Sequence, residues 1–190
     1  MFDFILANFA LHITLNATEQ AHVTAALQHK TVAKNEVLLE PGKICRNIYF
    51  VNKGCLRIFN TDKEGLEHNI LFQPENWWAV DLASFSGQSP AFYSISALEP
   101  TEVLYLSYQA LELLYINVPK LERFFRILTQ NGFSFFQRRI NYNLSKTAEE
   151  RYAMFQKQYP KLEQRIAQKH IASYLGITPV FLSIIRGRNS

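Results

Sequence analysis

The residues best suited to contact a phosphate backbone lie near the C-terminus of the 190-residue sequence. They combine cationic side chains with hydroxyl donors, spaced as on two consecutive helices. Such groups can pair with phosphate oxygens and with base edges in a DNA groove. The candidate DNA contacts are Lys169, His170, Thr178, Val180, Phe181, Ser183, Ile184, Arg186 and Arg188.

Residues 169–186 are expected to form a helix, a tight turn and a second helix. Gly176 suits the left-handed conformation at a helix end, and Thr178-Pro179 supplies an N-cap hydroxyl followed by proline at the first helical position. The expected buried positions are Ile171, Ala172, Leu175, Leu182 and Ile185. This pattern is typical of a DNA-binding helix-turn-helix. The alternative is a helical hairpin that does not touch nucleic acid.

The second helix of this unit has an unusual outward face. Val180, Phe181 and Ile184 are apolar, so they can touch thymine methyl groups but cannot form bidentate hydrogen bonds with bases. The sequence therefore supports DNA binding more strongly than sequence-specific reading. An alternative function is a protein–protein interaction or small-molecule-sensing module whose helix-turn-helix does not read DNA specifically.

The net positive charge of the chain comes from one segment. Residues 1–145 hold 12 Lys and Arg against 13 Asp and Glu, whereas residues 146–190 hold 8 against 3. Attraction to a phosphate backbone requires such a basic segment, although a solvated basic surface would have the same composition.

Other chemistry has weak support in the sequence. Cys45 and Cys55 are too few for a four-cysteine metal or iron–sulfur site, and the five histidines lack paired ligand spacing, so we expect no metal and no bound cofactor. No nucleophile with its base and no glycine-rich phosphate loop is visible, which argues against an enzyme. The sequence contains no apolar run long enough to span a membrane and no secretory signal, which predicts a cytoplasmic protein without a membrane partner.

The elements that precede the basic segment predict an α+β fold. Residues 3–12 and 18–29 read as short helices, the second with Thr18 as N-cap. Short β runs broken by turn residues then extend from about residue 31 to residue 106, which is typical of an antiparallel, jelly-roll-like barrel. A helix over 108–116 follows, and Thr147 with Glu150 forms a capping box at the start of a helix over 148–158.

The segment 119–145 predicts one long helix with a continuous apolar stripe. A helix of about 26 residues spans roughly 39 Å, more than a small domain can cover. We therefore expect the stripe to pair with the same helix of a second subunit in a homodimer; the alternative is that it packs on its own barrel. The candidate dimer residues are Leu121, Phe124, Phe125, Leu128, Phe135 and Phe136. The expected domains are a barrel domain over 1–118, a dimerisation helix over 119–145 and an all-α helix-turn-helix domain over 146–190.

Four stretches resemble the Crp/Fnr family of transcription regulators, especially its short members in Bacteroidetes. They are YFVNKGCLR at 49–57, PENWW at 74–78, AEERY at 148–152 and KHIASYLGITP at 169–179. The resemblance covers nearly the whole chain. It implies a sensor barrel with the cyclic-nucleotide-binding fold, a dimerisation helix and a DNA reader. Duplex DNA, a second copy of the chain and RNA polymerase are the implied partners.

Comparison with the family's cAMP-binding members bears on whether this chain binds a cyclic nucleotide. Family members that bind cAMP carry a Gly-Glu-Leu turn and, about ten residues later, an Arg for the phosphate; here the turn reads Val80-Asp81-Leu82, and no Lys or Arg occurs between Lys63 and Lys120. A buried phosphodiester would lack a cation, so we expect that cAMP is not the effector. A pocket for an unknown small molecule could instead be lined by Trp77, Trp78, Asp81, Leu82, Phe92 and Tyr93, unless these aromatic residues belong to the core.

Overall fold

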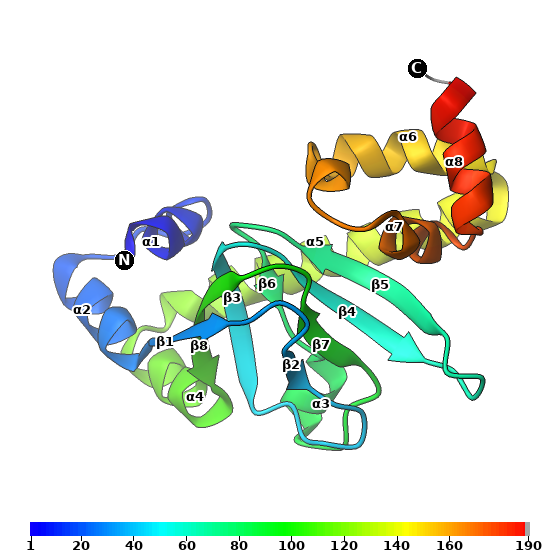
Figure 1. Ribbon diagram of the computed structural model, residues 1–190. Helices are drawn as coiled ribbons and strands as arrows, with labels where there is room; N and C mark the ends of the chain where they lie inside the picture. The colour runs from blue at the N-terminus through cyan, green and yellow to red at the C-terminus, as the bar shows by residue number, and fades with distance from the viewer. Residues whose placement is uncertain (189–190) are drawn as a thin grey trace.

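Two four-stranded antiparallel sheets form the barrel in the computed structural model, which describes residues 1–188 (Figure 1). The strand orders are β1-β8-β3-β6 and β2-β7-β4-β5, which confirms the predicted antiparallel, jelly-roll-like architecture. The strands are β1 (Gln28–Val32), β2 (Val37–Leu39), β3 (Asn47–Lys53), β4 (Leu56–Thr61), β5 (Glu67–Gln73), β6 (Trp78–Ala79), β7 (Ser94–Ala97) and β8 (Thr101–Ser107).

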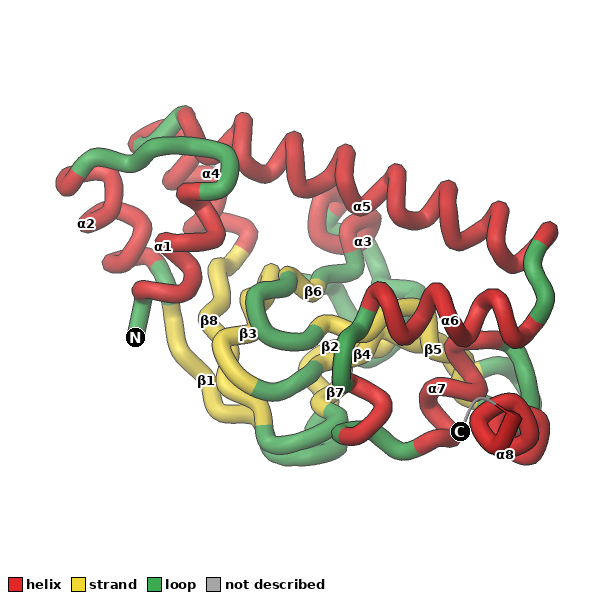
Figure 2. The backbone as a smooth tube through the Cα atoms, turned by 90° about the horizontal axis from the view of Figure 1, so that it is seen from above, coloured by secondary structure: helices red, strands yellow, loops and turns green. Residues whose placement is uncertain are grey.

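Helices flank the barrel, and the longest of them, α5, connects it to the C-terminal helices (Figure 2). The helices are α1 (Asp3–Ala10), α2 (Ala17–Ala26), α3 (Leu82–Gly87), α4 (Tyr108–Asn117), α5 (Lys120–Ser145), α6 (Ala148–Gln158), the 3-10 turn η1 (Leu162–Gln164), α7 (Gln168–Leu175) and α8 (Pro179–Arg188). None of the described helices is long and apolar enough to cross a membrane. Residues 189–190 of the predicted C-terminal domain lie outside the described part.

Local sequence signals explain several element boundaries. The capping box of Thr147 and Glu150 is confirmed: the Glu150 backbone N–H donates to Thr147 Oγ1 at 3.2 Å, and Glu150 Oε2 accepts from the Thr147 N–H at 2.9 Å. The predicted N-cap Thr18 is wrong, because Asn16 caps α2 in an equivalent box with Glu19. The predicted helix over 18–29 was also too long, since residue 28 already begins β1, where it pairs with Tyr105 of β8.

The core fills the barrel and extends under α4 and the first turns of α5. Both cysteines are buried, free thiols, and burial raises the pKa of Cys55 to about 12. Two short elements, α3 and β6, were not predicted. They are six and two residues long, too short to produce a periodic apolar pattern.

Candidate nucleic-acid interface

The unit α7–turn–α8 has the predicted helix-turn-helix geometry. Gly176 adopts φ +67° at the end of α7, and its N–H and that of Ile177 bond to carbonyls of the last turn of α7. Thr178 Oγ1 then accepts a hydrogen bond from the Phe181 backbone N–H at 3.2 Å and so caps α8. All five predicted inward positions are buried: Ile171, Ala172, Leu175, Leu182 and Ile185.

The outward side of α8 is accessible and apolar near its start. Val180 is 72% exposed and Ile184 is 47% exposed, and Phe181 and Ser183 beside them are also exposed. At the end of the helix Arg188 is exposed, with its Nη1 3.7 Å from Glu149 Oε1. This face can therefore offer van der Waals contacts from its first turns and cationic contacts from its last turn.

The first helix of the unit, α7, packs on β5, the edge strand of its sheet (Figure 1). Ser173 Oγ donates to the Glu67 carbonyl oxygen at 2.7 Å and accepts from the Asn69 N–H at 3.0 Å. Arg139 of α5 donates to the Asn69 carbonyl oxygen at 3.2 Å and to the Tyr174 carbonyl oxygen at 2.9 Å. Side chains thus satisfy backbone groups that an edge strand leaves without a neighbouring strand.

His170 lies in this contact between α7 and the barrel. Its Nδ1 is 3.2 Å from Arg57 Nη1, and Asn69 Nδ2 donates to its carbonyl oxygen at 3.2 Å. Arg57 also forms a bidentate pair with Glu67, at 2.6 and 2.9 Å. Burial, followed by the nearby charges of Arg57 and Lys169, lowers the pKa of His170 to about 4. The prediction that His170 contacts DNA is wrong for this arrangement, because the ring is neutral and faces the barrel.

A second polar contact joins η1 to the barrel. Arg165 donates to both carboxylate oxygens of Glu75, at 2.9 and 2.7 Å, and also to Glu99. Glu75 in turn accepts a hydrogen bond from the Gly54 backbone N–H at 2.8 Å. A bidentate pair with an additional backbone donor fixes the orientation of the carboxylate. The pair therefore fixes the position of the C-terminal helices on the barrel.

An apolar cluster fills the space between these two polar contacts. Phe72 of β5 packs edge-on against Phe155 and Tyr159, with ring centroids 6.1 and 5.8 Å apart. Cys55 and Leu98 of the barrel belong to the same buried cluster as the inward residues of α7 and α8. A few barrel residues and the C-terminal helices therefore form a second apolar cluster, separate from the main core of the barrel. The boundaries predicted after residues 118 and 145 stay a prediction.

Comparisons with known proteins agree with this architecture. Residues 29–117 match the family model described as the cyclic nucleotide-binding domain. The chain is 27% identical to the fumarate and nitrate reduction regulatory protein of Vibrio cholerae over 202 residues, which cover 98% of this chain and 78% of that protein.

Solved structures share the fold. FixK2 from Bradyrhizobium japonicum superposes with a TM-score of 0.75 at 17% identity, over 85% of this chain and 83% of that one. A Crp/Fnr family regulator from Eubacterium rectale gives a TM-score of 0.70 at 19% identity, over 90% and 82%. In sequence and in fold the chain is therefore similar to transcription regulators of the Crp/Fnr family.

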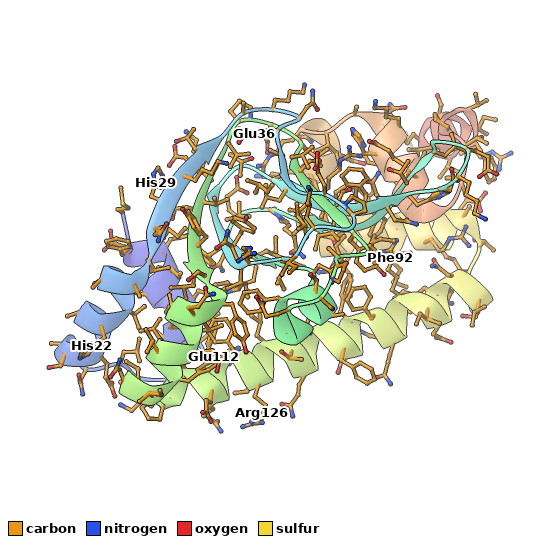
Figure 3. All side chains as sticks on the ribbon, turned by 90° about the horizontal axis from the view of Figure 1, so that it is seen from below. His22, His29, Glu36, Phe92, Glu112 and Arg126 are labelled. Carbon is orange, nitrogen blue, oxygen red and sulfur yellow. The ribbon has the colours of Figure 1, made fainter. Side chains whose placement is uncertain are left out.

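The predicted effector-pocket residues lie in different surroundings. Trp78 is buried in the core, where its Nε1 donates to Asn8 Oδ1 at 2.9 Å, whereas Trp77 packs against Tyr159 of the C-terminal helices. Leu82 is exposed. The phenyl ring of Phe92 is also exposed and lies at the surface, edge-on to Tyr93 at 5.0 Å (Figure 3). The predicted pocket is therefore wrong, because the two tryptophans face different neighbours.

Asp81, the sixth of these residues, caps α3. Its Oδ1 accepts from the Ser84 N–H at 3.1 Å, and its Oδ2 accepts from the backbone N–H groups of Phe92 and Tyr93, both at 3.1 Å. The side chain is buried. Three backbone donors therefore surround this carboxylate, which acts as an internal anion in the turn.

The predicted dimer residues on α5 divide into two groups. Leu121, Phe124 and Phe125 are buried in the protomer's own core, so their assignment to a subunit contact is wrong; Phe124, for example, packs edge-on to Phe9 of α1 at 4.6 Å. Leu128 and Phe135 are partly buried against that core, and Phe136 is exposed. The first part of the predicted stripe is thus covered by the barrel and α1 of the same protomer. Periodicity in the sequence does not indicate which surface covers it.

The exposed apolar residues of α5 lie closer to its C-terminus. Phe133 is 64% exposed and Ile140 is 60% exposed, and Phe136 and Leu144 are exposed beside them. Phe133 and Leu144 were absent from the predicted dimer set. The four exposed residues follow one another at steps of three and four residues, which is visible in the sequence. They lie on a different side of the helix from the buried positions at its start.

Proposed function

We propose that this chain is a transcription regulator of the Crp/Fnr family, that it binds duplex DNA through α8 as a homodimer, and that cAMP does not control it. The observation that carries the proposal is the α7–turn–α8 unit, whose α8 keeps an accessible outward face. The basic composition of residues 146–190 supports the same conclusion, because phosphate contacts supply most of the non-specific affinity for DNA. Contact with RNA polymerase stays a prediction.

The exposed stripe on α5 supports a homodimer. Phe133, Phe136, Ile140 and Leu144 recur on one side of a long helix, and the protomer itself does not cover them. Two copies of the helix packed across a two-fold axis would bury both stripes. Replacing Phe136 and Ile140 together by Glu is expected to give a folded monomer, measured by light scattering after size exclusion. A variant pair that stays dimeric would contradict this part of the proposal.

The geometry of Asp81 supports independence from cAMP. Its carboxylate turns inward to accept three backbone N–H groups, so it is not free to receive ribose hydroxyls. The absence of Lys and Arg between residues 63 and 120 also leaves this loop without a cation for a phosphate. Titration of the purified protein with cAMP is expected to give no binding heat and no change in DNA affinity.

DNA binding is tested by capture of genomic fragments at two salt concentrations. We expect retention at low salt and a log–log decrease of affinity with a slope of about −0.9 per phosphate contacted. Arg188→Gln should reduce that slope by about one. Lys53→Gln removes an exposed cation of the barrel and serves as the matched control. No binding at low salt, or binding that does not respond to salt, would contradict DNA recognition.

A second candidate function is favoured by the exposed apolar start of α8. Val180 and Ile184 could form a contact for a protein partner. Replacing both by Thr should then abolish partner capture while DNA affinity stays the same or rises. Loss of DNA affinity without loss of a protein partner supports the first function instead.

A further inference from the structure

A cavity of about 290 Å³ lies between the C-terminal half of α5 and the helices α6 and α7. Four of its lining side chains are cations, namely Arg138, Arg139, Arg151 and Lys157, and none of the lining residues is acidic. This composition differs from that of the aromatic set predicted in the barrel. We propose that the cavity binds a small anion that carries an aromatic ring, and that this ligand is the effector of the regulator.

Arg139 is a cation of the cavity wall that would attract an anion. Burial lowers its pKa, yet its only described hydrogen-bond partners are the carbonyl oxygens of Asn69 and Tyr174. The guanidinium also stacks on the Tyr174 ring, with its carbon 3.8 Å from the ring centroid. Within residues 1–188 it forms no ion pair with a carboxylate. A partly buried cation without a counter-ion is unfavourable, so an anion placed in this cavity would be stabilised.

Arg151 adds a donor that the protein does not use. Its Nη1 donates to the Lys146 carbonyl oxygen at 2.8 Å, but its Nε is buried and has no hydrogen-bond partner among the described residues. A buried donor without a partner is rare in folded proteins. Arg138 and Lys157 also line the cavity; both are exposed and form no ion pair among the described residues, so their charges are available to a ligand.

The aromatic part of the ligand follows from the walls. Phe135, Tyr142, Phe155 and Tyr174 line the same cavity, and the rings of Phe155 and Tyr174 lie 5.7 Å apart. Flat rings prefer offset or edge-on packing against such side chains. The volume is at the lower end for ligand pockets, which limits the ligand to about one ring with a charged group.

The cavity stays accessible when α5 pairs with a second subunit. Phe135, Arg139 and Tyr142 line the cavity, while Ile140 and Leu144 belong to the exposed stripe. At 3.6 residues per turn the two faces point roughly 140° apart around α5. A ligand can therefore bind without displacing the proposed dimer partner.

The position of the cavity provides a route to regulation. Arg139 connects three elements, because it belongs to α5 and bonds to β5 and α7. A ligand held between α5, α6 and α7 binds best to the arrangement in which these helices are packed together, and it shifts the population towards that arrangement. This regulatory role rests on the proposed function, whereas binding to the cavity does not.

The test is calorimetric titration of the full chain at low ionic strength with benzoate, phenyl phosphate, inorganic phosphate and neutral benzamide. We expect benzoate or phenyl phosphate to bind at least tenfold more tightly than inorganic phosphate and benzamide. Tighter binding of benzoate would identify the charged group of the ligand as a carboxylate, and tighter binding of phenyl phosphate would identify it as a phosphate monoester. Equal binding of benzamide, or no binding of either aromatic anion, would overturn the proposal.

Variants locate the site. Arg138→Gln together with Lys157→Gln should weaken binding of the better anion at least tenfold, while circular dichroism shows an unchanged fold. Arg126→Gln is the control, because Arg126 lies on the same helix and projects away from it into solvent (Figure 3). An equal loss in the control variant would overturn the assignment to this cavity. Fluorescence polarisation with DNA separates the two proposals: DNA binding without anion binding refutes only the effector site, and the reverse refutes only DNA recognition.

Discussion

The Ser173 hydroxyl donates a hydrogen bond of 2.7 Å to the Glu67 carbonyl oxygen, across 106 positions of sequence. The same hydroxyl accepts from the Asn69 N–H at 3.0 Å, so one side chain serves two backbone groups of β5. The first helix of the helix-turn-helix is thereby attached to the barrel by atoms that a small substitution can remove.

Replacing Ser173 by Ala should weaken this attachment. Loss of both hydrogen bonds is expected to lower the free energy of unfolding by about 1–3 kcal/mol, measured by denaturant titration. Amide hydrogen exchange at Asn69 should become faster, because its N–H loses its acceptor. Ser145→Ala is the control, since that hydroxyl bonds only within its own helix, to Asn141. Unchanged exchange at Asn69 would contradict the described contact.

Acidification should loosen the same contact through His170. Its pKa is lowered to about 4 by burial and by the charges of Arg57, Lys169 and Lys34, against an opposing effect of Glu67. Between pH 6.5, the ordinary pKa, and about pH 4 the unfolded chain binds more protons at His170 than the folded chain does. The contribution of His170 to the free energy of unfolding is therefore fully present above this window and is lost as the pH falls through it. The NMR titration of the His170 ring checks the pKa. A midpoint near 6.5 would show that the ring is not held in this environment.

Thymine methyl groups should contribute to DNA affinity if α8 reads the major groove. Val180 and Ile184 are exposed at the start of the helix, and apolar side chains recognise that methyl. Replacing thymine by deoxyuridine in a captured fragment should cost about 0.8 kcal/mol, or roughly fourfold in affinity, for each methyl contacted. The double variant Val180→Ala and Ile184→Ala should lose this difference. Equal affinity of the wild type for both DNAs would exclude methyl readout.

Gly54 should not tolerate a side chain. Its φ is +92°, and an added Cβ would lie 2.6 Å from Thr101 Oγ1 and 2.7 Å from the Pro100 carbonyl oxygen. Gly54→Ala is expected to cost about 2–5 kcal/mol, from left-handed strain together with overpacking. Gly42→Ala is the matched control: its φ is +81° and no atom lies within 4 Å of the added Cβ, so only the strain remains. Thermal unfolding of the two variants measures the difference.

Local signals in the sequence were sufficient for the C-terminal helices. The Thr147 capping box, Gly176 and Thr178 act within a few residues, so their neighbours in sequence are also their partners in space. The Asn16 box with Glu19 was equally local, and its Asn-x-x-Glu spacing could have been preferred over Thr18. The barrel followed from the alternation of short β runs with turn residues.

Contacts between distant segments could not be predicted in the same way. His170 has the residue type and position of a DNA contact, and only the docking of α7 on β5 places it beside Arg57. Trp77 and Trp78 are adjacent in sequence, yet they pack against Tyr159 and Phe9 in different clusters. The cations of the α5–α6 cavity are separated by up to 19 positions between Arg138 and Lys157, without a motif to connect them.

The contact between α7 and β5 makes any movement of the helix-turn-helix away from the barrel unfavourable. If α7 leaves the barrel, Glu67 and Asn69 expose unpaired backbone groups on an outer strand, and Phe72 loses part of its apolar cover. An open strand edge is a template for pairing with other chains. The conformation with α7 released would therefore be prone to self-association unless DNA or a second protomer covers the exposed edge. Its lifetime would be limited by the protein concentration as well as by its free energy.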